Sequence, residues 1–341
     1  MSVWVGLVVF ATASVLAGYL AGPAARITLL DHPNDRSLHQ RPIPRTGGLA
    51  MLAASLIGGF LVGWTLPVSR PGLGLLLLGL APLAVVSLLD DRGGIRFQWR
   101  LAAHVWAAFS LVLAGYKPDW FELPGLVMPL SSGFAFLLTL LFGVWMINLY
   151  NFMDGMDGFA GGMALIGFAT LAWLGRADSA FMSACLIAAA ASAGFLVHNF
   201  PPARLFMGDT GSIMLGFLAA ACSLWGNKIG LFPLWAALLI FSPFVVDATV
   251  TLLRRLLRGE NVLEAHRTHY YQRLVLLGWG HRRTVLTEYA LMLACAGSAV
   301  WAVRLSPAGQ ISLLVGWWLV YSLLMWGVGR LERRRARVSI P

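Results

Sequence analysis

The chain has 341 residues, of which 58% are hydrophobic and 12% are charged. Soluble domains carry about 25% charged and about 45–50% apolar residues, so the composition excludes an ordinary water-soluble enzyme and indicates a membrane protein. The 25 Lys and Arg residues outnumber the 15 Asp and Glu residues, which gives a net charge of +10. In a membrane protein such an excess orients the chain against an anionic leaflet, so nucleic acid is not the expected partner.

Hydropathy predicts an all-α polytopic membrane protein with about eleven transmembrane helices, each of roughly 20 residues. These spans leave only about ten residues for each loop or tail, so we expect a single transmembrane domain over residues 1–341. The first apolar segment lacks the basic start of a cleaved signal peptide, and we expect it to be retained. The predicted spans are residues 3–22, 47–66, 72–89, 101–116, 131–150, 158–175, 179–198, 211–226, 231–252, 284–303 and 310–329.

The distribution of cations predicts the orientation of the chain. An odd number of spans puts the two termini on opposite sides of the membrane and divides the loops into two alternating groups. One group holds 20 Lys and Arg residues and the other holds five. By the positive-inside rule the first group faces the cytoplasm, with the N-terminus outside and the C-terminus inside. The polar cytoplasmic loops are residues 23–46, 90–100, 151–157, 199–210 and 253–283.

Six aspartates at the predicted inner ends of spans indicate a site. They are Asp90, Asp91, Asp154, Asp157, Asp209 and Asp247. Ionisable groups near membrane depth are costly and suggest function, although a single Asp at a helix end often only caps the helix. Mg²⁺ commonly binds one or two carboxylates together with substrate phosphates, whereas no Cys or His spacing here suggests zinc. We therefore expect a Mg²⁺ site for phosphate chemistry, with Mn²⁺ as the alternative ion.

Glycine and basic residues in the same loops support a phosphate ligand. Glycines adjoin aspartates in DGMDGFAGG (residues 154–162) and MGDTGS (residues 207–212), where the backbone could approach an anion closely. The first inner loop adds arginines among prolines, and Arg suits phosphate recognition. The last inner loop places His266 and His269 on one face if that segment is helical. Alone, the first inner loop would also fit a positive-inside loop without a ligand, and a lone His pair would more often be structural.

Together these motifs resemble the polyprenyl-phosphate N-acetylhexosamine-1-phosphate transferases of glycosyltransferase family 4. This family includes the enzymes that start O-antigen, enterobacterial common antigen and peptidoglycan lipid synthesis. The resemblance implies transfer of an N-acetylhexosamine 1-phosphate from a UDP-sugar to undecaprenyl phosphate, with release of UMP. It also implies a bacterial inner-membrane location with the active site facing the cytoplasm. The matching segments are DHPNDRSLHQRPIPRTGG, DDR, NLYNFMDGMDGFAGG, NFPPARLFMGDTGS and HRTHYYQ. The peptidoglycan branch has adjacent histidines in its last inner loop, so the HRTH spacing is more similar to the O-antigen branch.

The resemblance also assigns roles to individual residues. Asp209 matches a Mg²⁺ ligand, and Asp90 and Asp91 match a pair near the metal and the lipid phosphate. The residues expected at the metal are therefore Asp209, Asp90 and Asp91. His266 and His269 match histidines beside the diphosphate and sugar, so the expected catalytic residues are Asp90, Asp91, His266 and His269. The residues expected to bind substrate are Arg36, His39, Arg45, Asn148, Asn151, Asp154, Asp157, Asn199 and Arg267.

Two mechanisms and two other functions stay open at this stage. Asp90 could take a proton from the acceptor phosphate before direct attack, or an aspartate could act as a covalent nucleophile in two steps. A polytopic transporter of a lipid-linked or anionic solute is the alternative function, although it should place ionisable residues near the bilayer midplane. A lipid-binding scaffold would need the basic face but not the ordered aspartates. The sugar, the pathway and a homodimeric state are not specified by the sequence.

Overall fold

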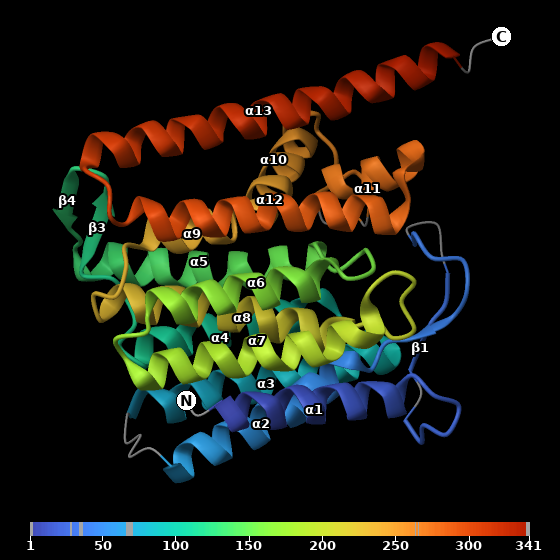
Figure 1. Cartoon of the computed structure of the whole chain (residues 1–341), viewed down its shortest axis with the longest axis horizontal. Helices are drawn as coiled ribbons and strands as arrows, with labels where there is room; N and C mark the ends of the chain where they lie inside the picture. The colour runs from blue at the N-terminus through green and yellow to red at the C-terminus, as the bar shows by residue number, and fades with distance from the viewer. Residues whose placement is uncertain are drawn as a thin grey trace.

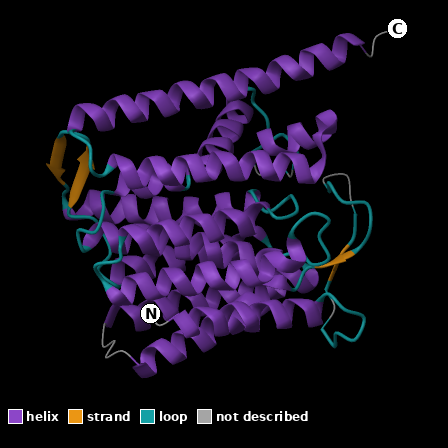
Figure 2. Cartoon of the chain, in the orientation of Figure 1, coloured by secondary structure: helices purple, strands orange, loops and turns teal. Residues whose placement is uncertain are grey.

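Long helices that lie mostly side by side form the chain (Figure 1, Figure 2). The computed structural model describes residues 3–27, 29–33, 37–65, 71–262, 264 and 266–338. Each predicted span coincides with helical structure. The helices are α1 (Val3–Leu20), α2 (Gly47–Thr65), α3 (Pro71–Gly93), α4 (Phe97–Leu113), α5 (Ser132–Phe152), α6 (Phe159–Leu174), α7 (Ser179–Asn199), α8 (Gly208–Lys228), α9 (Leu234–Ile240), α10 (Ser242–Leu257), α11 (Tyr270–Leu274), the π-helical turn η1 (Val275–Trp279), α12 (Gly280–Ala302) and α13 (Pro307–Val338).

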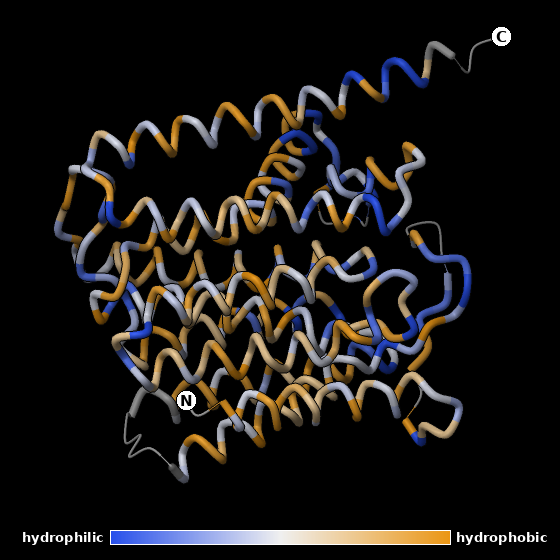
Figure 3. The backbone as a smooth tube through the Cα atoms, viewed as in Figure 1, coloured by the Kyte–Doolittle hydropathy of each residue, from blue (hydrophilic) through white to orange (hydrophobic). Residues whose placement is uncertain are grey.

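The helices confirm a polytopic membrane protein. Within the described ranges, seven helices are long and apolar enough to cross a membrane, or eight if a bent pair counts as one span. Apolar residues run along the helices, whereas hydrophilic stretches gather at their ends, most extensively at the end that carries β1 and α11 (Figure 3). Helix α6 is apolar but has only 16 residues. The number of eleven spans and the orientation of the termini stay predictions.

The prediction of one continuous helix over residues 231–252 is wrong. This segment consists of α9 and α10, which are bent by 82° at a break beside Phe241. Pro243 in the first turn of α10 has no N–H and cannot continue the hydrogen bonding of α9. The Ser242 hydroxyl donates to the Leu239 carbonyl across the break, at 2.7 Å. Helix α10 thereby leaves the direction of its neighbours (Figure 1).

Helix α8 lies inside the bundle and is buried along most of its length. It packs on α5, α3 and α2, so protein rather than lipid surrounds it. Small residues allow this close packing, because a Cβ on Gly48 would lie 2.3 Å from the Gly211 nitrogen, and one on Gly216 would lie 2.6 Å from the Met146 oxygen. The first turn of α8, which carries Asp209, is thus held against the start of α2.

Two short antiparallel hairpins were not predicted. Strands β1 (Leu30–Asp31) and β2 (Ile43–Pro44) pair within the first inner loop. Strands β3 (Trp120–Leu123) and β4 (Leu126–Pro129) pair between α4 and α5. Strands of two and four residues are too short to leave a clear alternating pattern in the sequence, which explains why only the helical core was predicted.

Candidate active site

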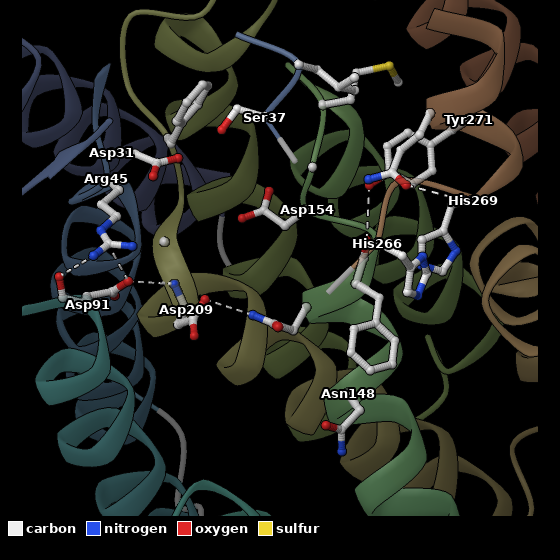
Figure 4. Close-up of a pocket in the computed structure, with 18 of the residues that line it drawn as sticks. Asp31, Ser37, Arg45, Asp91, Asn148, Asp154, Asp209, His266, His269 and Tyr271 are labelled. Carbon is white, nitrogen blue, oxygen red and sulfur yellow. Dashed lines mark hydrogen bonds and ion pairs between the residues drawn. The ribbon is translucent and has the colours of Figure 1, made fainter. Parts of the chain in front are cut away.

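A cavity of about 640 Å³ opens among the predicted inner loops (Figure 4). Its walls come from the first loop, the ends of α3 and α5, the starts of α4 and α8, the loop after α5 and the loop before α11. The structure therefore brings distant motifs into one site. The predicted site residues that line the cavity are His39, Arg45, Asp91, Asn148, Asn151, Asp154, Asp157, Asn199, Asp209, His266 and His269.

Two of the described predicted site residues do not line the cavity. Asp90 is held just outside it, and Arg267 is an exposed residue of the last loop. Arg36 lies outside the described residues.

Asp91 at the end of α3 holds the start of α8. Its Oδ1 accepts the Asp209 N–H at 3.0 Å, and its Oδ2 accepts the Thr210 N–H at 3.0 Å and the Thr210 hydroxyl at 2.7 Å. Its side chain is 1% exposed. Gly208 has φ of 72°, and a Cβ there would lie 2.6 Å from the Arg45 carbonyl oxygen, so this turn requires glycine. Asp91 thus caps free N–H groups of α8 and orients Asp209.

Arg100 links the two other carboxylates of this region. Its Nη1 lies 3.0 Å from Oδ2 of Asp90, and its Nη2 lies 3.6 Å from Oδ2 of Asp209. Asp90 also accepts the Ile95 N–H at 2.7 Å, and only 8% of its side chain is exposed. Asp209 is 29% exposed and lines the cavity, whereas Asp90 does not.

The asparagines of α5 lie beside Asp209. Asn151 donates through Nδ2 to Asp209 Oδ1 at 3.0 Å and to the Ser212 hydroxyl at 3.0 Å. One turn earlier, Asn148 donates to the Val144 carbonyl at 2.7 Å and contacts Nδ1 of His104 at 3.2 Å. These bonds leave both carboxamide oxygens without a partner among the described residues, so they can meet a ligand.

Among the described carboxylates that line the cavity, Asp154 alone has no protein partner. Figure 4 places it in the open part of the cavity, between Asp209 and Tyr271. No hydrogen bond or ion pair joins its carboxylate to another described residue. Burial raises the pKa of Asp154 well above its usual value, and the nearby charges of Asp209, Asp91 and Asp31 raise it further. A bound cation or hydrogen-bond donor would relieve this cost.

Asp157 and His281 connect three loops. The Asp157 Oδ1 lies 2.9 Å from Nδ1 of His281, and its Oδ2 accepts the Ala203 N–H at 3.0 Å. The ring of His281 also lies near the backbone of Leu38 in the first loop. His281 begins α12 and lines the cavity, although it was not predicted as a site residue.

Asn199 has both polar groups satisfied by the backbone. It accepts the Gly158 N–H at 2.9 Å and donates to the Leu205 carbonyl at 2.9 Å. It is 4% exposed, and the structure therefore supports a role in shaping the wall of the cavity.

Asp247 organises the last inner loop. Its carboxylate accepts the N–H groups of Tyr270 at 2.9 Å and Tyr271 at 3.1 Å, and it lies 3.2 Å from Nδ1 of His269. The two histidines do not lie on a helix, because α11 begins only at Tyr270. The rings of His266 and His269 nevertheless lie 4.8 Å apart.

His266 is neutral near pH 7. Burial lowers its pKa to about 4, and the neighbouring His269 and Arg255 add to this effect. Its Nδ1 accepts the Thr268 N–H at 3.4 Å, so the ring proton belongs on Nε2, which is then a donor.

The first loop is fastened at both of its described site residues. Arg45 donates through Nη2 to the Asp91 carbonyl at 2.7 Å, and its side chain is about one-third exposed. His39 packs edge-on against Phe206 and lies 3.8 Å from Oδ2 of Asp31. Arg45 is thus a cation at the cavity wall near Asp209.

The donor set fits Mg²⁺ that is shared with a phosphate ligand. In the described part of the chain, no three His, Cys, Asp or Glu side chains converge to hold a metal. Mg²⁺ does not require such a cage, since it commonly uses one or two carboxylates with phosphate oxygens and water. Asp209 and the Asn151 carboxamide provide oxygen donors next to the unpartnered Asp154.

Comparison with known proteins agrees with this site. Residues 73–227, which include the α3 aspartates, the α5 motif and Asp209, match the model of glycosyl transferase family 4. A probable undecaprenyl-phosphate N-acetylglucosaminyl 1-phosphate transferase from Bacillus subtilis is 31% identical, over 81% of this chain and 78% of the relative.

Two further relatives also match most of the chain. A decaprenyl-phosphate N-acetylglucosaminephosphotransferase from Mycobacterium tuberculosis is 29% identical, over 89% of this chain and 84% of the relative. An undecaprenyl-phosphate alpha-N-acetylglucosaminyl 1-phosphate transferase from Escherichia coli is 28% identical, over 80% and 77% respectively. The chain therefore belongs to glycosyl transferase family 4, in the group of polyprenyl-phosphate N-acetylhexosamine-1-phosphate transferases.

Proposed function

We propose that this protein transfers an N-acetylhexosamine 1-phosphate from a UDP-sugar to undecaprenyl phosphate and releases UMP. The observation that carries the proposal is the grouping of Asp209, Asp154, Arg45 and Arg100 on one cavity at the inner loops of a membrane protein. Such a site can accept a diphosphate and a lipid phosphate together, because cations and a metal reduce the repulsion between the two anions. The names of the relatives support the same reaction.

Within this proposal the residues divide by the group that they contact. Asp209 holds Mg²⁺, with Asp90 close by through Arg100. When bound, the ion would neutralise charge on the diphosphate. Arg45 and Arg100 provide fork-shaped donors for phosphate oxygens. Asn148, Asn151 and Asp154 serve the nucleotide side, while His266 and His269 serve the diphosphate and sugar.

The surroundings of Asp90 and Asp91 support direct attack by the lipid phosphate. Asp91 uses both carboxylate oxygens to hold α8, and Asp90 is largely buried between Ile95 and Arg100. Neither side chain is positioned as a free nucleophile for a covalent step. Under this mechanism the arginines align the two phosphates, and a group on the cavity wall accepts any proton left on the acceptor.

We also propose a single domain of eleven spans in the bacterial inner membrane, with the cavity facing the cytoplasm. The excess of cations in one set of loops supports this orientation. The polar loops around the cavity belong to that set, which is where nucleotide sugars are available. O-antigen or a related envelope polysaccharide is the proposed pathway, on the basis of the HRTH motif.

The decisive experiment identifies the released nucleotide. Purified protein is incubated with undecaprenyl phosphate, Mg²⁺ and a panel of UDP-N-acetylhexosamines. UMP release is expected, only when the lipid is present, and excess UMP should convert the labelled lipid back to UDP-sugar. Release of UDP would instead indicate attack at the anomeric carbon. If the protein moves a solute across vesicle membranes and no donor gives a lipid product, the protein is a transporter and not a transferase.

A further inference from the structure

The cytoplasmic end of α13 is joined to the loop that carries the site histidines. Arg273 of α11 forms a two-point ion pair with Glu332 of α13, with Nε 2.6 Å from Oε1 and Nη2 bonded to Oε2. A second contact follows one turn later, where Arg335 donates to the Leu276 carbonyl at 2.9 Å. Elsewhere α13 is mostly exposed, although its Tyr321 hydroxyl lies 2.7 Å from the Ser242 hydroxyl. The contacts of Glu332 and Arg335 are therefore what attaches the end of α13 to α11 and η1.

Arg273 also contacts Tyr270, which follows the site histidines in the chain. Its guanidinium lies 4.4 Å from the ring centre of Tyr270, and Arg254 of α10 donates to the Tyr270 hydroxyl at 3.0 Å. The Arg273 side chain is only 10% exposed, whereas Glu332 is 39% exposed. Loss of Glu332 would leave a largely buried cation without its counter-charge, so the Arg273 side chain would have to move.

Tyr270 in turn lies next to the cavity. Its N–H donates to Asp247, the same carboxylate that receives Tyr271 and contacts His269. The His269 ring is 2% exposed and lines the cavity beside His266. A change at Arg273 therefore reaches His269 through Tyr270 and the Asp247 carboxylate.

We infer that Glu332 and Arg273 are positioning residues, through which the end of α13 fixes the His266–Gln272 segment of the candidate active site. The inference rests on the proposed function for its kinetic consequence but not for the structural coupling itself. The inference also gives the basic stretch at residues 330–337 a part in shaping the site.

The test compares Glu332→Gln with Arg334→Gln in the full-length protein. Arg334 lies two residues away and is exposed, and no contact of its side chain is known among the described residues. With UDP-N-acetylglucosamine as donor, Glu332→Gln should raise KM roughly three- to tenfold with a smaller change in kcat, since a partly exposed ion pair has a modest energy. Arg334→Gln should leave KM unchanged. Combining Arg273→Gln with Glu332→Gln should add little to either single change.

Amide hydrogen exchange gives a readout that does not depend on catalysis. Exchange over residues 269–274 should become faster, by about threefold or more, in Glu332→Gln than in Arg334→Gln. Equal exchange and equal KM in the two variants would overturn the coupling. If wild-type protein releases no UMP, the proposed function fails, and the exchange comparison still decides the coupling.

Discussion

Asp209 lies at the centre of the site, because its carboxylate lines the cavity and its backbone N–H is held by Asp91. Asp209→Asn should lower kcat by more than about a hundredfold, because metal binding contributes several kcal/mol to charge stabilisation. The fold should survive, since the Asp209 backbone N–H still donates to Asp91. Thermal unfolding and UMP release across a Mg²⁺ series measure both effects.

The matched control for this substitution is Asp119→Asn. Asp119 is exposed on the β3 side of the molecule, where it pairs with Lys228 at 2.6 Å. Its replacement should leave turnover unchanged. Normal turnover by Asp209→Asn at low Mg²⁺ would contradict the assignment of Asp209.

Asp154 should couple stability to pH. Burial raises its pKa, so the folded protein keeps a proton that the unfolded chain releases near pH 4. Stability from this group is therefore lost as pH rises from about 4 toward the raised pKa. In buffer with a chelator, Asp154→Asn should increase the unfolding temperature more at pH 7 than at pH 5, by roughly 2–4 °C for each kcal/mol.

Calorimetry or a fluorescence scan at a fixed heating rate would measure this difference. Asp154→Asn should also reduce transfer, because the carboxylate lines the cavity. An unfolding temperature that rises equally at the two pH values would show that the Asp154 carboxyl is ionised throughout.

At the scale of elements, the start of α12 connects loops that lie far apart in the sequence. His281 contacts Asp157 after α5 and the Leu38 backbone in the first loop, while Asp157 holds Ala203 before α8. His281→Asn should raise KM for the UDP-sugar about tenfold. Without the ion pair to Asp157, three loops of the cavity wall would no longer be held together. Steady-state kinetics with varied donor measure the effect.

Arg282→Asn is the control for His281→Asn. Arg282 is the next residue on α12 and is exposed. Its replacement should leave KM near the wild-type value. If both variants behave alike, the contact between His281 and Asp157 does not shape the site.

The sequence identified the elements well where a strong pattern specifies them. Apolar runs predicted the helices, and aspartates at span ends predicted where the cavity lies. The break between α9 and α10 was missed because a wide hydropathy window averages over it. The signal was present, since Ser242 and Pro243 interrupt the run and proline rarely continues a helix.

Arg100 and His281 were missed for a different reason. Neither belongs to a recognisable motif, and Arg100 was counted only as a topology cation. Their roles depend on tertiary contacts with Asp90, Asp209 and Asp157, which a single sequence does not encode as spacing. The position of Arg100 early in the helix after DDR was the available hint, because it faces the same membrane boundary as the aspartates.

At the scale of the whole molecule, the cavity side can be determined by labelling. In a background with Cys185, Cys222 and Cys295 replaced by alanine, Ser306→Cys should react with an impermeant thiol reagent on intact cells. Gln40→Cys should react only after permeabilisation, because the first loop is expected inside. Both residues are exposed in the structure, so access to the protein surface does not limit either reaction.

The reverse labelling pattern would place the cavity outside the cell. Cytoplasmic nucleotide sugars would then be out of reach, and the proposed transfer could not occur there. The three native cysteines are buried, and replacing them by the smaller apolar residue alanine should have little effect on the fold that is labelled.

The length of the last helix makes the lipid bilayer a partner in this geometry. The apolar part of α13, residues 307–329, is about 34 Å long, close to the hydrocarbon thickness of roughly 30 Å. Glu332 lies in the first turn beyond it, so bilayer thickness sets how far Glu332 stands above the membrane surface. Long acyl chains would draw this turn inward and short ones would tilt the helix, with a cost for each ångström of mismatch. We therefore expect the fatty-acid composition of the host membrane to affect the position of the His266–Gln272 segment.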